Sequence, residues 1–424
     1  MPETGKDLIA QLPLRERDPA NPGFMALDNI RVLDFTRALA GPQATQVLGD
    51  FGADIIKVEM PGKGDDSRMS LPQHRIGGES AFFLALNRNK RSIAVDINSD
   101  AGREIILDLL ETCDVLVENF TSRVMRRIGL DYASLKERFP GLIYCSVSAY
   151  GRTGSLSEAA GFDTPVSAEA GLCRLNSRPG EAPTIGGTPW TDLTTGLNAA
   201  IAILIALQAR SRTGMGQMVE AAMYDTALSN LTFRGYECLV SGEEPRAIPV
   251  QALRGIPRGQ FATQDGVLVI TAGGDKMFRA FATQVIDKPE WAEDPRLATD
   301  NGRAGHAEEL LGAINAILQG QTSAYWSQRC KAAGVPCGIM KDVGEALLSP
   351  ETAEREMVYR VPHPTAGAVP VIANPARLWG TPQETAAAPP LLGQHTREIL
   401  AELAGYDEAL VSALIEQGVI GTLG

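Results

Sequence analysis

Strands and helices alternate along the first half of this 424-residue chain, and this alternation constrains the fold more than any other feature. Short apolar segments typical of buried strands lie at 30–35, 53–59, 92–97, 114–118 and 142–147, with helical spacing at 44–51 and 101–111. Strands separated by helices of about ten residues favour parallel pairing, because a parallel connection has to cross the sheet. We therefore predict an α/β fold whose large domain is a doubly wound, Rossmann-like parallel sheet.

The chain is long enough for two domains, since one domain usually takes about 150 residues. A helix predicted over 193–210 and a strand over 217–222 continue the alternation of strands and helices. This alternation ends after residue 230, and residues 241–260 are rich in Pro, Gly and Arg. We expect an N-terminal arm over 1–28 and a large domain over 29–230 that is completed by 346–424. Linkers near 231–244 would lead to a smaller α+β domain over 245–345.

Composition excludes several classes of protein. Lys and Arg number 39 against 51 Asp and Glu, and the net charge of −12 argues against a general nucleic-acid binder. The longest apolar run, Ala199 to Leu207, has nine residues, about half the length of a membrane-spanning helix. Six cysteines show no Cys-x-x-Cys pair and no metal-ligand spacing, and no apolar signal segment follows the N-terminus. We expect a cytoplasmic protein without membrane or nucleic-acid partners and without a metal.

The common catalytic motifs are missing. The first strand is followed by Arg37-Ala-Leu-Ala-Gly-Pro42 instead of a glycine-rich dinucleotide loop. The chain also contains no P-loop, no Gly-x-Ser-x-Gly elbow and no His-Glu-x-x-His, and it has only four histidines. These absences favour a carboxylate as the nucleophile.

Asp192 is the leading carboxylate, because it stands where an apolar helix begins. Its position alone allows two interpretations, an N-cap or a nucleophile whose charge and oxyanion intermediates are stabilised by the helix N-terminus. Asp163 before Thr-Pro is a second candidate, or a turn residue. The sequence also offers two basic clusters for phosphate groups, at 87–91 and 123–127, and Asp65 and Asp66 look like a solvated loop.

The chain resembles the family III CoA-transferases, the CaiB/BaiF family, along nearly all of its length. The segments that carry the resemblance are RVLDFTRALAGPQATQVLGDFGADIIKVE (31–59), LNRNKRSIAVDI (86–97), DVLVENF (114–120), RTGMGQ (212–217), GVPCG (334–338) and PLLGQHT (390–396). The family relationship implies an enzyme that moves CoA between carboxylic acids, with CoA as substrate and no tightly bound cofactor. It also implies two interlocked chains, so we expect a homodimer.

The resemblance assigns roles to individual residues. Asp192, in Thr191-Asp-Leu-Thr-Thr-Gly196, matches the family's nucleophilic aspartate. The CoA contacts of the family fall here on the backbone of Leu39 and on Ala40, Asn119, Phe120, Arg127 and Phe162. Arg37 is our choice for the cation that binds the second carboxylate of a dicarboxylic acceptor.

Three departures from the formyl-CoA:oxalate transferases bear on the ligands: those at Met60 and Asn98 imply different contacts to the adenine and phosphates of CoA, and the one at 254–260 argues against oxalate. Formyl-CoA:oxalate transferases carry an arginine where Met60 stands and a lysine where Asn98 stands, and they close a glycine-rich loop where this chain has the short segment 254–260. The segments 31–59 and 390–396 look closest to succinyl-CoA:dicarboxylate (glutarate-like) members. We therefore expect succinyl-CoA as a donor and a small dicarboxylic acid as an acceptor.

The implied mechanism is ping-pong, through an aspartyl anhydride and an aspartyl-CoA thioester, with water excluded by a mobile lid. Two alternatives stay open. Racemases of the same family read His-Asp where Phe162-Asp163 stands and need a second histidine before it, whereas this chain has no histidine between residues 75 and 305. A non-catalytic CoA-binding subunit is the other alternative, against which the aspartate at 192 argues.

Overall fold

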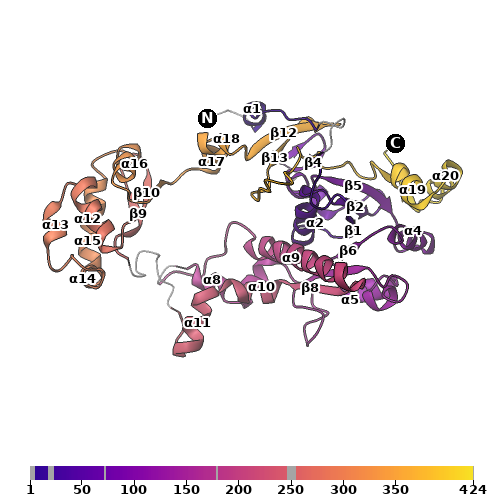
Figure 1. Cartoon of the computed structure of the whole chain (residues 1–424), viewed down its shortest axis with the longest axis horizontal. Coiled ribbons are helices and arrows are strands. Elements are labelled where there is room, and N and C mark those ends of the chain that lie inside the picture. Colours follow the sequence, from indigo (N-terminus) through magenta and orange to yellow (C-terminus); the bar gives the residue numbers. More distant parts are fainter. Residues whose placement is uncertain (1–4, 18–22, 71–72, 178–179, 246–254, 424) are drawn as a thin grey trace. The chain divides into compact units, whose positions relative to one another are not determined.

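A seven-stranded sheet organises the first of two compact units (Figure 1). The structure is a computed structural model that describes residues 5–17, 23–70, 73–177, 180–245 and 255–423. In spatial order the strands are β14 (Ile420–Gly421), β5 (Lys90–Val95), β2 (Asp54–Glu59), β1 (Arg31–Asp34), β6 (Val115–Glu118), β7 (Ile143–Ser148) and β8 (Met218–Ala222). All neighbours pair in parallel except β14, which pairs antiparallel with β5. The predicted doubly wound parallel sheet is confirmed.

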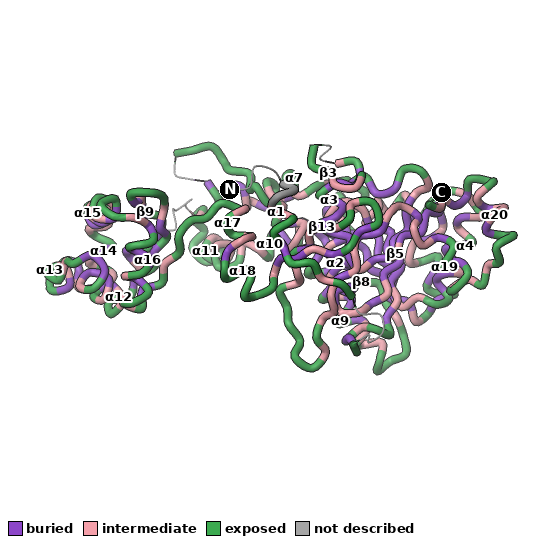
Figure 2. Tube along the Cα trace, turned by 90° about the horizontal axis from the view of Figure 1, so that it is seen from above, coloured by how far each residue is buried: buried purple, intermediate pink, exposed green. Residues whose placement is uncertain are grey.

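Helices cover both faces of this sheet because the strands are apolar on both faces. In β1, Leu33 packs in one core with α4 (Asp100–Leu110) and α19 (Thr396–Ala404), while Val32 packs in the opposite core with α2 (Ala40–Asp50) and α9 (Trp190–Thr213). The sheet is therefore the middle one of three layers, and its strands are largely buried (Figure 2).

The strand order places a topological switch point between β1 and β6. From β1 the chain builds β2 and β5 on one side, and it then crosses back to add β6, β7 and β8 on the other. The loops that leave the carboxyl ends of β1 and β6 consequently diverge, and doubly wound sheets usually bind their ligands at this edge. The predicted CoA contacts at 39–40 and 119–120 follow these two strands directly.

The remaining elements of the first unit are mostly short. They are α1 (Gly5–Ala10), η1 (Asp66–Met69), β3 (Arg75–Ile76), β4 (Glu79–Ser80), α3 (Ala81–Leu86), α5 (Ser122–Arg127), α6 (Tyr132–Leu135), α7 (Asp163–Glu169), α10 (Met223–Asn230), α18 (Pro350–Glu354), β12 (Val358–His363), β13 (Gly367–Ile372) and α20 (Glu408–Glu416). α8 (Leu172–Leu175) and α11 (Thr232–Ser241) lie where the chain passes between the units.

The first unit comprises residues 1–172, 186–232 and 350–424, and the second comprises 173–185 and 233–349. The second unit has an antiparallel sheet in the order β11 (Cys337–Ile339), β10 (Val267–Thr271), β9 (Arg258–Ala262). Its helices are α12 (Asp275–Ala280), the single π-turn η3 (Phe281–Val285), α13 (Pro289–Glu293), α14 (Asp300–Gly305), α15 (Ala307–Leu318), α16 (Ser323–Ala332) and α17 (Val343–Leu347). Its core is separate and gathers around residues such as Leu268, Phe281 and Ile314.

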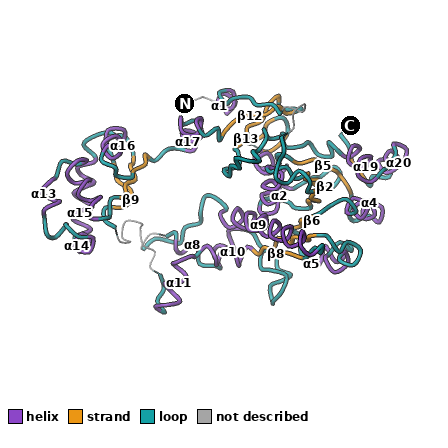
Figure 3. Tube along the Cα trace, viewed as in Figure 1, coloured by secondary structure: helices purple, strands orange, loops and turns teal. Residues whose placement is uncertain are grey.

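Three local expectations differ from the structure (Figure 3). The N-terminal arm is not wholly extended, because α1 forms and Leu14 bridges to Arg360. The expected linker at 231–244 is largely α11. The hairpin of β12 and β13 was not predicted, because the segment 346–390 contains several prolines. The hairpin tolerates Pro362 and Pro370 because a two-stranded ribbon leaves many backbone N–H groups without a sheet partner.

α9 is the one helix, in the part of the chain that the structure describes, that is long and apolar enough to cross a membrane, with a mean hydropathy of 1.4 over its best window. Length and composition are weak evidence for a span, because a core helix passes the same criterion. α9 also packs along α2 and against β7, β8 and α10, as a helix of the outer layer does.

Candidate active site

The turn after β1 and the strand end after β6 are joined by one side chain. The Asn119 amide accepts a hydrogen bond from the Arg37 N–H at 3.0 Å and donates one to the Arg37 carbonyl at 2.8 Å. Both ends of the amide are thus bonded to the backbone of the turn. The structure brings Arg37, Leu39 and Ala40 beside Asn119 and Phe120, at the switch point where parallel sheets bind ligands.

Buried charges lie beneath this turn, on the face of the sheet that α2 covers. Lys57 donates hydrogen bonds to Asp65 and to the Thr36 carbonyl, each at 2.8 Å, and Lys90 bonds Asp34 at 3.0 Å. Burial is the largest single influence on the pKa of the Asp65 carboxyl and raises it, yet the Lys57 charge and hydrogen bonds outweigh burial and lower that pKa to about 2. For Lys90 burial prevails over Asp34 and lowers the pKa to about 8.

The expectation for the loop at Asp65 and Asp66 is wrong for its first residue. Asp65 is 1 % exposed, and its carboxylate accepts hydrogen bonds from Lys57, from the Ala38 N–H, and from the N–H and hydroxyl of Ser67. Only Asp66 is solvated. A lysine inside the apolar strand Ile-Ile-Lys57-Val was the available signal, because a buried lysine needs an anionic partner.

The basic cluster at 87–91 is structural and does not hold phosphates as predicted. Arg88 is paired with Asp50, Lys90 with Asp34, and Arg91 with Asp54, Glu398 and Glu402. Because each cation already has a carboxylate partner, the cluster is engaged in ion pairs around β5 and offers no free positive charge.

The second cluster, at 123–127, makes up most of α5, whose last turn lies close to the two positions that depart from the formyl-CoA:oxalate transferases. Arg126 pairs with Glu158. Arg127 donates a hydrogen bond to the Asn98 side chain at 3.1 Å, and Asn98 in turn contacts the Met60 sulfur at 3.8 Å. The side chains expected to differ in nucleotide contacts are therefore neighbours in space.

Arg37 and Phe120 stack, with the guanidinium carbon 4.8 Å from the ring centroid. The Arg37 side chain is 28 % exposed and lies 3.9 Å from Asp66, which is already paired with Lys63 at 3.1 Å. The Arg37 charge is therefore only partly compensated by carboxylates of the described residues.

A second buried ion pair holds the end of β6. Glu118 accepts hydrogen bonds from Arg152 and from the Phe120 N–H, each at 2.8 Å, and Arg152 also donates to the Phe120 carbonyl. Burial raises the pKa of the Glu118 carboxyl, and Arg152 opposes that rise. Sequence analysis missed this pair, because the two residues are 34 positions apart and only the fold brings them together.

Asp192 lies within the first turn of α9 and is not its N-cap. The helix begins at Trp190 with Pro189 in the cap position, so the N-cap interpretation is wrong. The Asp192 N–H donates to the Asp163 carboxylate at 3.0 Å, and the Thr191 and Ser167 hydroxyls are 2.6 Å apart. The first turns of α7 and α9 therefore lie side by side, with two carboxylates at their junction.

The pKa of the Asp192 carboxyl is raised from 3.8 to about 7, first by burial and then by the negative charge of Asp163. This carboxyl accepts no hydrogen bond from the described residues that would lower the pKa again. A half-buried carboxylate without donors is poorly solvated, and poor solvation makes its oxygen a better nucleophile.

Gly196 connects this carboxyl to the turn at the switch point. A Cβ on Gly196 would lie 2.5 Å from the Ala40 carbonyl oxygen, so only glycine allows α9 to approach the start of α2 this closely. Residues four apart share one face of a helix, so Asp192 lies on the side of α9 that packs against Ala40. Phe162 caps α7 beside Asp163 and is 75 % exposed.

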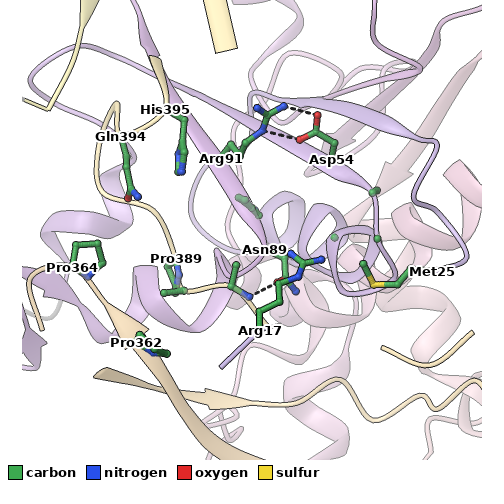
Figure 4. A pocket seen from close by; sticks show the side chains of 16 residues that line it. Arg17, Met25, Asp54, Asn89, Arg91, Pro362, Pro364, Pro389, Gln394 and His395 are labelled. Carbon is green, nitrogen blue, oxygen red and sulfur yellow. Dashed lines mark hydrogen bonds and ion pairs between the residues drawn. The ribbon is translucent and has the colours of Figure 1, made fainter. Parts of the chain in front are cut away.

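A cavity of about 450 Å³ lies elsewhere, at the amino ends of β2 and β5, and none of the predicted site residues lines it. Figure 4 shows the Asp54 carboxylate paired directly with the Arg91 guanidinium on the wall of this cavity, which also includes His395 and Pro389. Ligands of doubly wound sheets bind at the carboxyl ends of strands, and the cavity occupies the opposite edge.

Two further expectations concern the lid and metals. Residues 258–260 of the expected lid segment belong to β9 and pair with β10, and Arg254 lies outside the described residues. Within the described ranges no group of three or more His, Cys, Asp or Glu side chains is arranged to bind a metal ion.

Comparison with known proteins identifies the family. The model of CoA-transferase family III matches residues 27–396. The chain belongs to this family. It is 36 % identical over 416 residues to succinyl-CoA:glutarate CoA-transferase of Mus musculus, covering 98 % of this chain and 94 % of the relative. Formyl-CoA:oxalate CoA-transferase of Afipia carboxidovorans is 31 % identical over 419 residues, covering 93 % and 98 % of the two chains.

The fold also matches solved structures of the family. A CaiB/BaiF family protein from Brucella suis superposes with a TM-score of 0.81 at 33 % identity, covering 89 % of this chain and 99 % of the other. The resemblance read from the sequence motifs is confirmed, and the homologues support an enzyme of the CoA-transferase type.

The raised pKa of Asp192 predicts a pH-dependent effect of Asp192→Asn on stability. The unfolded carboxyl loses its proton near pH 4 and the folded one near pH 7, so the parent loses stability between these values and the neutral variant does not. In urea unfolding, we expect the stability of the variant relative to the parent to grow by about 2 to 3 kcal/mol between pH 5 and pH 7. The difference in stability between variant and parent should level off above pH 7.

Asp163→Asn provides the control background. Removing the neighbouring charge lowers the pKa of Asp192, so the growth with pH should shrink there but persist, because burial is the larger cause. A stability difference that does not vary with pH would contradict the raised pKa.

Proposed function

We propose that the protein is an acyl-CoA:carboxylate CoA-transferase that takes CoA from a donor such as succinyl-CoA and passes it to a small dicarboxylic acid. The observation that carries the proposal is the position of Asp192, a poorly solvated carboxyl that shares a helix face with the contact to Ala40 at the switch point. Family membership supports the reaction class, and the name of the mouse relative, a succinyl-CoA:glutarate CoA-transferase, supports the choice of substrates.

In the proposed mechanism, an ionised Asp192 oxygen attacks the thioester carbonyl of the donor and expels CoA thiolate, which leaves an acyl-aspartyl anhydride. The thiolate attacks the aspartyl carbonyl, releases the donor acid and forms an aspartyl-CoA thioester. The acceptor carboxylate attacks that thioester and expels the thiolate, which then takes the acceptor acyl group from the second anhydride and regenerates Asp192. No net proton or electron is exchanged.

The surroundings of Asp192 fit these steps. Both anhydrides are hydrolysed easily, so water has to be kept away from them. The half-buried position of Asp192 limits the access of water. The Asp163 carboxylate accepts a hydrogen bond from the Asp192 N–H and thereby fixes the junction of α7 and α9. Its negative charge also raises the pKa of the Asp192 carboxyl, which is therefore only partly ionised at neutral pH. CoA would extend from this point past Leu39 and Ala40 toward Phe120, Arg127 and Asn98, with Phe162 beside the reacting end.

The decisive experiment mixes the protein with succinyl-CoA and a panel of acids that includes glutarate, oxalate and monocarboxylates, followed by chromatography of the CoA esters. We expect a new ester with one or two dicarboxylates. With the donor alone, mass spectrometry should find CoA attached to Asp192. Asp192→Ala should reduce transfer by more than about 1,000-fold and still bind CoA.

Asp407→Ala is the control, because Asp407 is an exposed N-cap of α20, a helix that packs on the other face of the sheet. Unchanged turnover in Asp192→Ala, or CoA attached to another residue, would refute the nucleophile. Deuterium entering the α-carbon of the acyl group from heavy water would instead favour the racemase. CoA binding without transfer or exchange would favour the non-catalytic subunit.

Arg37 is proposed to bind the second carboxylate of a dicarboxylic acceptor. Its guanidinium is stacked on Phe120 and only partly compensated by Asp66, so an acceptor carboxylate can still pair with it. Arg37→Ala should lower kcat/KM for dicarboxylates about 100-fold and for monocarboxylates less than about threefold. Equal losses for both classes would exclude this role.

We also propose that two copies of the chain associate, as the family resemblance implies, and that the protein acts in the cytoplasm. α9 exposes a stripe of large apolar side chains at helical spacing, formed by Leu197, Ile201, Leu204 and Ile205. A second copy would cover this stripe.

Sedimentation should show a dimer for the parent, and Ile201→Asp with Ile205→Asp should weaken it, whereas Ser211→Asp at the polar end of α9 should not. A parent that sediments as a monomer would contradict the dimer.

A further inference from the structure

The turn between β1 and α2 is held by side chains from four elements or loops, of which only Asp34 is close to it in sequence. The Thr36 N–H donates to Asp34, and its carbonyl accepts from Lys57. Asn119 takes both backbone groups of Arg37, and the Ala38 N–H donates to Asp65 at 3.2 Å. Each backbone polar group from the Thr36 N–H to the Ala38 N–H is therefore fixed by a side chain, an arrangement far more rigid than an ordinary surface turn.

The backbone of this turn adopts a conformation that it would not keep by itself. Ala38 has a φ of +62°, in the left-handed region, which costs an alanine about 1 kcal/mol. A non-glycine residue stays there only where its surroundings hold it. Asp65 accepts a hydrogen bond from the N–H of the strained residue, and Lys57 bonds the Thr36 carbonyl two residues before it, so both members of the pair hold the backbone that leads into Ala38.

The Lys57–Asp65 pair is the buried part of this support. Both side chains are 0 % exposed, and Lys57 stays charged because Asp65, Asp34 and Glu59 together outweigh burial and raise its pKa. A buried ion pair is a poor source of stability, since apolar side chains of similar size often serve a fold equally well. Here both partners also bond the turn, which points to a role in fixing its conformation.

We propose that Lys57 and Asp65 are positioning residues, which hold the Arg37–Leu39 turn in the conformation that binds acyl-CoA. The proposal rests on the proposed function, because it assumes that Leu39 and Ala40 contact CoA. Neither Lys57 nor Asp65 has to touch the substrate. Their contribution is preorganisation: a turn already fixed before binding loses no conformational freedom when the ligand arrives.

The test replaces the pair by apolar residues, Lys57→Met with Asp65→Leu, so that no unpaired charge stays buried. The matched control is Arg88→Met with Asp50→Leu, which removes another buried ion pair. The two pairs are comparable because the carboxylates of Asp65 and Asp50 each accept four hydrogen bonds.

We expect the Lys57/Asp65 variant to raise the KM for acyl-CoA and the Kd for CoA by about tenfold or more, with kcat changed less than about threefold. Hydrogen exchange over residues 35–40 should accelerate at least about tenfold in this variant. The Arg88/Asp50 control should lose comparable stability and show neither change.

If the Lys57/Asp65 variant does not fold, Asp65→Asn gives the same test in milder form, because Lys57 and Ala38 bond different oxygens of the carboxylate and an amide keeps only one of them. Exchange over 35–40 and a Kd for CoA equal to those of the parent, in either variant, would overturn the proposal. A parent that binds no CoA would instead refute the proposed function, while the exchange measurement would still show whether the pair holds the turn.

Discussion

The conformation of the turn between β1 and α2 depends on two ion pairs buried beneath it, Lys57 with Asp65 and Lys90 with Asp34. Charges in an apolar layer must be matched and hydrogen-bonded, and here the remaining bonds go to the backbone that leaves β1. The turn that begins α2 is thereby fixed at the switch point, the edge at which doubly wound sheets bind ligands. The helix that carries the proposed nucleophile then packs against this fixed turn.

A second constraint is the close approach of α9 to α2. Because Gly196 has no side chain, the first turns of α9 reach the Ala40 carbonyl, and Asp192 is drawn into a half-buried position beside Asp163. Burial and the neighbouring charge raise its pKa to about 7, against the expected stabilisation of its charge by the helix N-terminus, and a substantial fraction of the carboxyl is still ionised at neutral pH. The close packing of α9 on α2 is therefore also what raises the pKa of the Asp192 carboxyl, because it buries that carboxyl.

Much of the architecture could be predicted because the relevant forces act over short stretches of sequence. Apolar strands separated by helices predict a doubly wound sheet, and Asp192 stood out because an apolar helix starts beside it. The predictions failed where the partner of a charged residue lies on another strand, helix or loop. Asp65 looked solvated until Lys57 was placed beneath it, and the cations at 87–91 looked available until Asp50, Asp34 and Asp54 were found opposite them.

The sequence by itself determined the family, the order of strands and helices, and the residue types from which a carboxylate nucleophile could come, since periodicity and motifs are local properties. Only the tertiary structure decided which charges are neutralised and which remain to act. The sequence does not distinguish a lysine or an aspartate in a core ion pair from one in a binding site. What distinguishes the two is the desolvation and the partner that the fold supplies, and these depend on residues tens or hundreds of positions away.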